Sequence, residues 1–185
     1  TTGCEGAAIM PVGTIAHETG HAFGLPDLYD LQRGSSGIGE WGLMGSGNFA
    51  RAYSPATYEA WSLTELGWVT VAPLTASRTI TTQARQVSDT VFLAQADSPT
   101  EYLLIENRQA VGSDTAQMNP AYARAKLPGL AIWHVDQQVV DTRYQSINSG
   151  IPQGVVLRQA DGKDDLGKGV NRGDRGDSWP GSAEV

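Results

Sequence analysis

The sequence has a single cysteine, Cys4, among 185 residues. Because an internal disulfide needs two cysteines, a disulfide framework within this chain is excluded. No run of 18 apolar residues occurs either, which excludes a membrane span of ordinary length. Basic side chains are also few, with 13 Lys and Arg against 20 Asp and Glu and a formal net charge of −7. Proteins that bind nucleic acid usually carry a basic face, so we expect no nucleic-acid partner.

The remaining composition is that of a folded domain. Hydrophobic residues make up 40% of the chain and charged residues 18%, enough apolar material to bury a core. The length suits one domain or a large part of one. The sequence starts at Thr1 with neither an initiator Met nor a signal pattern. We therefore expect an excerpt of a longer protein, whose upstream part would be a partner of this chain.

The chain divides into two regions of different texture. Residues 1–68 have the pattern of a helix, a Gly-rich loop and a second helix, whereas residues 69–185 consist of short β-type runs and an acidic C-terminal loop. Helices followed by strands predict an α+β fold. Residues 110–128 and 137–153 are rich in turn formers and should be surface loops. The predicted strands are Val69–Ala72, Thr79–Thr82, Thr90–Ala96, Glu101–Asn107, Leu130–Val135 and Val155–Gln159.

The first predicted helix runs from Pro11 to Phe23. Proline is favoured at the first helical position, and Gly24 is well placed to stop the helix in a left-handed conformation. Gly13 and Gly20 lie inside it and cost about 1 kcal/mol each relative to Ala, so tertiary contacts or a bound ion must stabilise the helix. Apolar residues at helical spacing predict a buried stripe. Its members are Val12, Ile15, Ala16, Thr19, Ala22 and Phe23.

A second helix is predicted from Pro55 to Leu66. Ser54 is a favourable N-cap, and Gly67 should end the helix.

The motif HETGHAFGLPD at residues 17–27 carries the chemistry. His17 and His21 are four residues apart, so both imidazoles lie on one face of the helix and can reach one zinc ion. Glu18 is rotated by about 100° from His17, which places its carboxylate beside the open coordination position. The turn at Gly24 swings Asp27 back toward the two imidazoles. These residues predict a His₂Asp zinc site with one position left for water.

Two alternatives apply to this motif. The histidines could be ordinary core residues bonded to main-chain carbonyls, although two of the three histidines of the chain share the motif. Asp30 also follows the turn and is the alternative third ligand.

Together with further segments, this motif resembles the immune inhibitor A-type family of secreted bacterial zinc metalloproteases. The likeness extends from the motif into Leu28-Tyr29-Asp30 and keeps the order of the family along nearly the whole chain. The other similar segments are WGLMGSG (41–47), LGW (66–68), YLLIENRQ (102–109), GLAIWHVD (129–136) and ADGKDDLGKGVNRGDRGD (160–177).

The resemblance implies a zincin with a metzincin-like lower catalytic subdomain, in which an active-site helix, a Met-turn and a second helix precede the β-rich region. Met44 would be the Met-turn, a hydrophobic floor under the metal site; the alternative is an ordinary Gly-rich turn. Protein or peptide substrates and an extracellular location are implied by the resemblance alone.

The expected mechanism is hydrolysis by metal-activated water. Zinc lowers the pKa of its bound water toward about 7, and Glu18 accepts the proton as that water attacks a peptide carbonyl. Tyr53 is the best candidate for a second oxyanion donor, with a packing tyrosine as the alternative. His134 lies in an apolar predicted strand, where we expect a structural histidine.

The acidic tail predicts a second metal. Its oxygen-bearing side chains occur on a Gly-rich segment that can fold around calcium, although the spacing is not that of an EF-hand. A solvated polar loop is the alternative. The candidate ligands are Asp161, Asp164, Asp165, Asn171, Asp174 and Asp177.

The sequence leaves three functional hypotheses. The first is a secreted zinc endopeptidase with Glu18 as general base. The second is a non-catalytic β-rich binding or structural module that retains an inert zinc motif. An intact Glu18 argues against it, since a structural zinc site needs no such carboxylate. The third is a zinc hydrolase that acts on non-peptide substrates.

Overall fold

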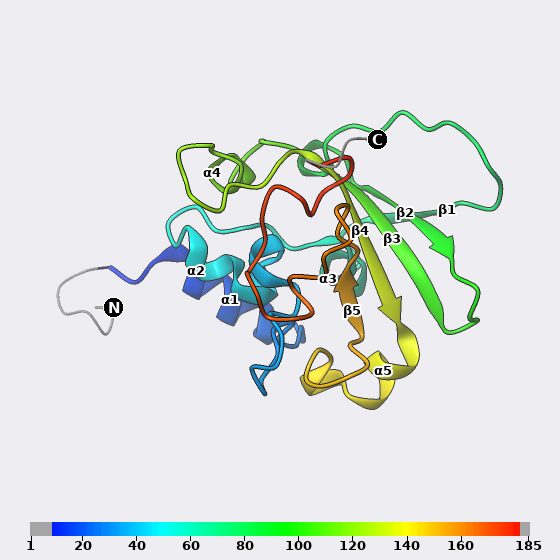
Figure 1. Cartoon of the computed structure of the whole chain (residues 1–185), viewed down its shortest axis with the longest axis horizontal. Coiled ribbons are helices and arrows are strands. Elements are labelled where there is room, and N and C mark those ends of the chain that lie inside the picture. Colours follow the sequence, from blue (N-terminus) through cyan, green and yellow to red (C-terminus); the bar gives the residue numbers. More distant parts are fainter. Residues whose placement is uncertain (1–8, 182–185) are drawn as a thin grey trace.

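The computed structural model describes residues 9–181 and shows a mixed α/β fold built on a five-stranded sheet (Figure 1). The strands are adjacent in chain order; β1 and β2 are parallel, and every later pair is antiparallel. This arrangement agrees with the predicted α+β class. The strands are β1 (Thr70–Pro73), β2 (Thr90–Gln95), β3 (Glu101–Arg108), β4 (Gly129–Asp136) and β5 (Val155–Leu157).

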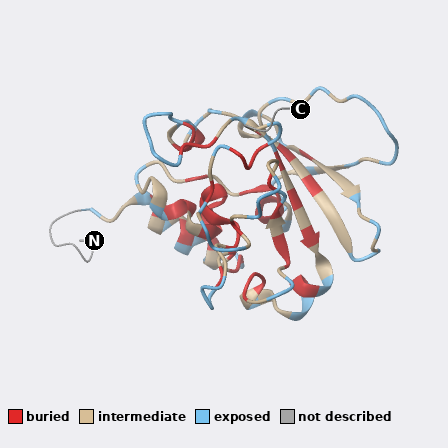
Figure 2. Cartoon of the chain, in the orientation of Figure 1, coloured by how far each residue is buried: buried red, intermediate tan, exposed pale blue. Residues whose placement is uncertain are grey.

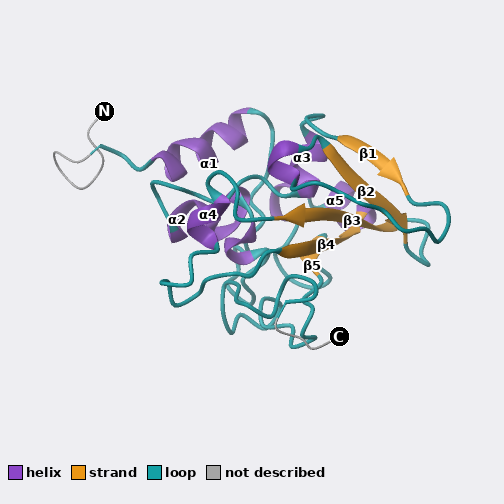
Figure 3. Ribbon diagram, turned by 90° about the horizontal axis from the view of Figure 1, so that it is seen from above, coloured by secondary structure: helices purple, strands orange, loops and turns teal. Residues whose placement is uncertain are grey.

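The helices are short and lie mostly before or between the strands. None in the described part of the chain is long and apolar enough to cross a membrane. In Figure 3, α1 and the loops that follow β5 lie at opposite sides of the molecule. The α-helices are α1 (Val12–Ala22), α2 (Asn48–Ala50), α3 (Ala60–Glu65), α4 (Asp114–Gln117) and α5 (Gln137–Thr142). The other helical turns are η1 (Gly39–Trp41), η2 (Leu43–Gly47), η3 (Arg85–Val87) and η4 (Tyr144–Ser146).

Five of the six predicted strands are confirmed, and Thr79–Thr82 is wrong. Because β1 and β2 are parallel, the chain between them must return to the starting end of the sheet. Residues 79–82 lie in this return and belong to no strand. A hydrogen bond from Asn107 Nδ2 to the carbonyl of Thr82 (3.3 Å) holds the return near β3.

The second helix begins later than predicted, at Ala60. The carboxylate of Glu59 caps it by accepting a hydrogen bond from the Ser62 amide (2.8 Å). The residues before Glu59 pair with η2 instead of forming helix: the Leu43 amide donates to the carbonyl of Thr57 (3.1 Å). Ser54 is therefore no N-cap, and its hydroxyl donates to the carbonyl of Ser113 (3.3 Å). The predicted stop at Gly67 is confirmed by its positive φ of 66°.

Helix α1 is confirmed to within one residue at each end, but the predicted buried stripe is wrong. Val12, Ile15 and Phe23 are about half exposed, at 46%, 47% and 55%. The buried residues of α1 are Gly13, His17 and Gly20, and Figure 2 shows buried and exposed positions alternating along the helix.

Two glycines explain why α1 turns this face inward. A Cβ atom at Gly13 would lie 2.1 Å from the carbonyl oxygen of Asn48, and one at Gly20 would lie 2.6 Å from Met44 Sδ. The helix thus approaches α2 and η2 too closely for any side chain at these positions. This packing is the tertiary contact that offsets the cost of glycine within a helix.

A single hydrophobic cluster joins the two predicted regions. It combines Trp41 and Met44, from before residue 68, with Leu104 and Trp133 of the central strands. All four side chains are fully buried. The division into two regions, residues 1–68 and 69–185, stays a prediction. The cluster contains residues of both regions.

The predicted surface loops at 110–128 and 137–153 are wrong in part, because each contains a helix and buried polar side chains. Asp114 and Asn148 are both fully buried. Asp114 accepts from Arg108 of β3 (2.7 Å), and Asn148 donates to the carbonyl of Leu28 (2.9 Å). Hydrogen bonds to distant parts of the chain keep these segments of the two loops buried. The composition of a loop does not reveal such partners.

Candidate metal centre

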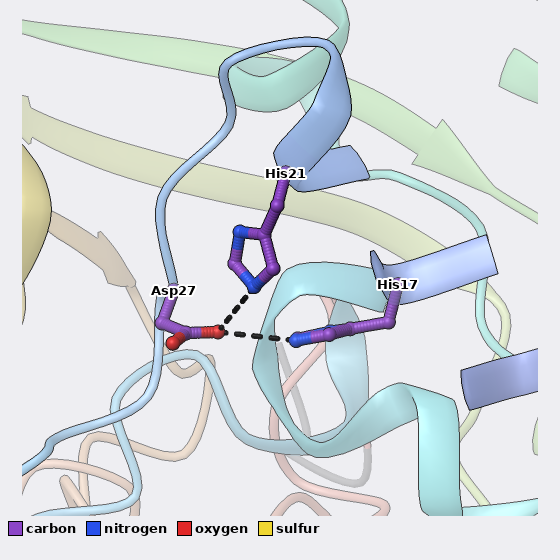
Figure 4. A group of neighbouring side chains, drawn as sticks. All are labelled: His17, His21 and Asp27. Carbon is purple, nitrogen blue, oxygen red and sulfur yellow. Dashed lines mark ion pairs between the residues drawn. The ribbon is translucent and has the colours of Figure 1, made fainter. Parts of the chain in front are cut away.

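The structure brings His17, His21 and Asp27 together at the end of α1 (Figure 4). The Nε2 atoms of His17 and His21 lie 3.1 Å and 3.3 Å from the same Asp27 oxygen, Oδ1. Within residues 9–181, this is the one group of three or more His, Cys, Asp or Glu side chains close enough to hold a metal ion. The three residues predicted from the motif therefore converge on one point.

Main-chain carbonyls orient both imidazoles. The Nδ1 atom of His17 donates to the carbonyl of Leu43 (2.9 Å), and that of His21 donates to the carbonyl of Leu25 (2.7 Å). A carbonyl only accepts, so the proton of each neutral ring is on Nδ1 and the lone pair of Nε2 faces Asp27. Histidine ligands of metals are commonly held in this way.

The turn after α1 positions the carboxylate. Gly24 adopts a positive φ of 99°, and the Leu25 amide donates back to the carbonyl of Gly20 (3.1 Å). This left-handed stop reverses the chain, so that Asp27 faces the two rings.

The alternative ligand Asp30 lies apart from the cluster. Its carboxylate accepts hydrogen bonds from the amides of Gln32, Gly34 and Ser35, at 2.8 to 2.9 Å. Asp30 therefore stabilises the loop that follows the site.

The carboxylate and the first imidazole perturb one another. Burial lowers the pKa of His17, but hydrogen bonds to Asp27 and to the carbonyl of Leu43, with the charges of Asp27 and Glu18, outweigh burial and raise it above 6.5. Burial raises the pKa of Asp27, yet a hydrogen bond from His17 when that ring is protonated, the Tyr29 hydroxyl and the charges of both imidazoles bring it below 3.8. Asp27 is consequently ionised at neutral pH.

The geometry fits a zinc ion. Ligand atoms about 2.0–2.1 Å from a tetrahedral zinc lie about 3.3 Å from one another, close to the two separations measured here. Asp27 Oδ1 is also buried without a well-formed hydrogen bond, and an unpaired buried carboxylate oxygen is costly. Two imidazoles and one carboxylate form a donor set typical of catalytic zinc.

Tyr29 belongs to the site and was missed by the sequence reasoning. Its ring stacks on that of His17 with 6.4 Å between centroids. Burial, a hydrogen bond to Asp27 and the charges of Asp27 and Glu18 raise the pKa of Tyr29 to about 12. The hydroxyl is therefore protonated at neutral pH. In the sequence, Tyr29 could have been found from its position two residues after Asp27, the candidate carboxylate ligand.

Two other predicted site residues, Glu18 and Met44, belong to α1 and η2. Glu18 is exposed and directly follows His17 in α1, and its charge contributes to the raised pKa of both His17 and Tyr29. Met44 is fully buried in η2 and packs against α1 at Gly20. The general-base role of Glu18 and the Met-turn role of Met44 stay predictions.

The structure does not bring Tyr53 or His134 into the cluster. Tyr53 is 74% exposed, and among the described residues no hydrogen bond or ring contact joins it to the metal ligands. Its role as an oxyanion donor stays a prediction. His134 Nε2 lies 2.6 Å from the carboxylate of Glu101 on β3, as expected of a structural histidine.

The six candidate calcium ligands are spread along the tail loop, and five of them have protein partners. Asp161 pairs with Lys163 at 3.0 Å, and Asn171 donates to Asp174 (2.8 Å). Asp177 is fully buried and accepts from Trp41 Nε1 (2.6 Å). Asp165 accepts from Asn171, and Asp164 is exposed. The calcium site has no support from these contacts and stays a prediction.

Comparison with known proteins gives one match. No curated protein and no solved structure matches the chain. Residues 5–69 match the family model described as immune inhibitor A peptidase M6, catalytic domain. The matched segment contains α1, the Gly24 turn, Asp27 and η2. The similarity indicates a metallopeptidase-type domain in this part of the chain.

Proposed function

We propose that this chain is part of a secreted zinc-dependent endopeptidase, with His17, His21 and Asp27 as the zinc ligands. The observation that carries the proposal is the convergence of two Nε2 atoms on one buried carboxylate oxygen. The similarity of residues 5–69 to a metallopeptidase family supports the same conclusion. Secretion follows from the family resemblance.

In the proposed hydrolysis, residues of this chain would bind the ion, transfer the proton and orient the ligands. A zinc ion held here would supply an acidified water and polarise the substrate carbonyl. Glu18, exposed beside the cluster, would take a proton from the attacking water and return it to the departing amine nitrogen. The carbonyls of Leu43 and Leu25 hold both imidazoles with Nε2 toward Asp27, the orientation that would let both rings bind the ion.

Two further residues would support this centre. The neutral hydroxyl of Tyr29 would donate to Asp27 and fix the carboxylate in its ligating orientation. Met44, buried under Gly20, would serve as the Met-turn of a metzincin-like lower subdomain. Tyr53 remains the proposed second oxyanion donor.

A cleavage assay tests the proposal against the two alternatives. The protein is loaded with zinc, freed of excess metal and incubated with casein, with and without a zinc chelator. Peptide release that disappears on chelation and returns with added zinc is the expected result. Bound zinc without release of peptides, in the full-length protein, would favour the non-catalytic module or a hydrolase of other substrates.

A further inference from the structure

A large open cavity lies beside the metal cluster. Its volume is about 1150 Å³, and its wall contains Tyr29, whose ring stacks on His17. Gly45 and Ser46, which follow Met44 in η2, form another part of the wall. The cavity thus borders the proposed active site on the side of Tyr29.

The charged side chains of this cavity are mainly basic. Arg33, Arg124 and Arg172 line it and are exposed. Its carboxylate is that of Asp30, which already accepts three main-chain hydrogen bonds. Arg124 pairs with buried Glu40 at 2.8 Å. Among residues 9–181, neither Arg33 nor Arg172 has a side-chain ion pair.

This local positive charge contrasts with the chain as a whole, whose formal net charge is −7. Guanidinium groups bind carboxylates through paired hydrogen bonds, so an arginine-lined wall favours an acidic ligand. Pockets of about 300–1,000 Å³ hold whole small ligands, and a cavity of this size accommodates several residues of an extended peptide.

We propose that this cavity is a substrate subsite that selects peptides with an Asp or Glu side chain near the scissile bond. Arg33 and Arg172 bind the substrate carboxylate, and Arg124 adds positive charge at the wall. The proposal rests on the proposed peptidase function. It predicts a preference for acidic sequence on one side of the cleavage site.

Matched peptides test the subsite with the zinc-loaded protein. One set places Glu at each position on either side of a fixed cleavage site, and a second set carries Gln there instead. We expect kcat/KM to be about fivefold higher for Glu than for Gln at one position, and expect the preference to weaken as salt increases. Variant R33Q/R172Q should lose the preference, so that its kcat/KM values for the Glu and Gln peptides become equal.

Arg175→Gln is the matched control, because Arg175 is an exposed arginine of the same tail loop that does not line the cavity. It should keep the preference. Arg124 is left intact because its loss would remove a partner of buried Glu40. Equal cleavage of Glu and Gln peptides, or an equal loss of preference in the Arg175 variant, would overturn the subsite.

A binding measurement separates this inference from the proposed function. Fluorescence anisotropy is recorded with zinc-loaded Glu18→Ala and labelled Glu and Gln peptides. Tighter binding of the Glu peptide that is lost with R33Q/R172Q supports the subsite even if no cleavage is detected. Equal binding of both peptides contradicts it even if the wild-type protein is an active peptidase.

Discussion

The Nδ1 atom of His17 lies 2.9 Å from the carbonyl oxygen of Leu43, the residue directly before Met44. The same turn that packs under α1 therefore also fixes the tautomer and direction of the first ligand. A contact between residues 26 positions apart thus couples the fold of η2 to the geometry of the metal site.

Replacing Glu18 separates metal binding from catalysis. Glu18→Ala should keep full zinc content and lose at least about 100-fold in kcat/KM, because the proton acceptor is removed while the ligands remain. Zinc analysis and peptide kinetics on the same sample measure both. Thr19→Ala, a neighbouring exposed change on α1, is the control. Activity of Glu18→Ala within about tenfold of wild type, about 1.4 kcal/mol, would refute the assignment.

Gly20→Ala tests the contact between α1 and Met44. The added Cβ would lie 2.6 Å from Met44 Sδ and 2.9 Å from the hydroxyl of Tyr58. We expect a loss of about 1–3 kcal/mol in the free energy of unfolding, as for other overpacked cores. Combining Gly20→Ala with Met44→Ala should give a loss smaller than the sum of the single losses. Additive losses would show that the two residues do not compete for space.

Buried Arg108 should be important for stability. It donates to the carbonyl of Trp41 (2.9 Å) and to Asp114 (2.7 Å), which joins β3 to the segment before η2. Arg108→Met removes the cation paired with buried Asp114. We therefore expect the free energy of unfolding in urea to fall by about 3–5 kcal/mol. Arg158→Met, at an exposed position, should change stability by less than about 0.5 kcal/mol. Similar losses in the two variants would show that the buried network contributes little.

Zinc affinity should depend on pH through His17. In the metal-free protein, burial lowers the pKa of His17, but its contacts, chiefly the hydrogen bond to Asp27, raise the pKa above 6.5. The protonated ring cannot bind metal, so zinc affinity should decrease as pH falls through this raised pKa.

The stability of the metal-free protein should depend on pH in the opposite direction from zinc affinity, decreasing as pH rises. The contribution of the His17–Asp27 pair is complete below about pH 6.5 and is lost as pH rises through the folded-state pKa. Thermal unfolding at about pH 6 and about pH 8 measures this, with Asp27→Asn as the reference that lacks the pair. An identical pH dependence in wild type and Asp27→Asn would contradict the coupling.

The convergence of His17, His21 and Asp27 could be predicted from the motif, because it depends on local structure. The four-residue spacing of His17 and His21 and the glycine stop at Gly24 act within one helix and one turn. The carbonyl partner of His17 was not predictable, since Leu43 is distant in sequence. The contact of Tyr29 with His17 could not be predicted either, because it depends on the direction in which the turn orients the Tyr29 ring.

The wrong predictions share a physical cause. An apolar stripe with Val12 and Ile15 indicates helix, but the side that α1 buries is decided by the close approach that Gly13 and Gly20 permit. Similarly, residues 79–82 have strand composition, and the parallel pairing of β1 with β2 makes them a return segment. Both outcomes depend on tertiary packing, which the secondary-structure propensities of the residues do not predict.

Locating a bound zinc ion is the most direct test of the metal centre formed by His17, His21 and Asp27. A crystal of the zinc-loaded protein, measured on both sides of the zinc absorption edge, locates the ion by anomalous scattering. The account predicts one peak about 2.0–2.2 Å from Nε2 of His17, Nε2 of His21 and a carboxylate oxygen of Asp27. A peak ligated by Asp30 or His134 in place of Asp27, or no peak between the two imidazoles, would contradict the metal centre and the function proposed from it.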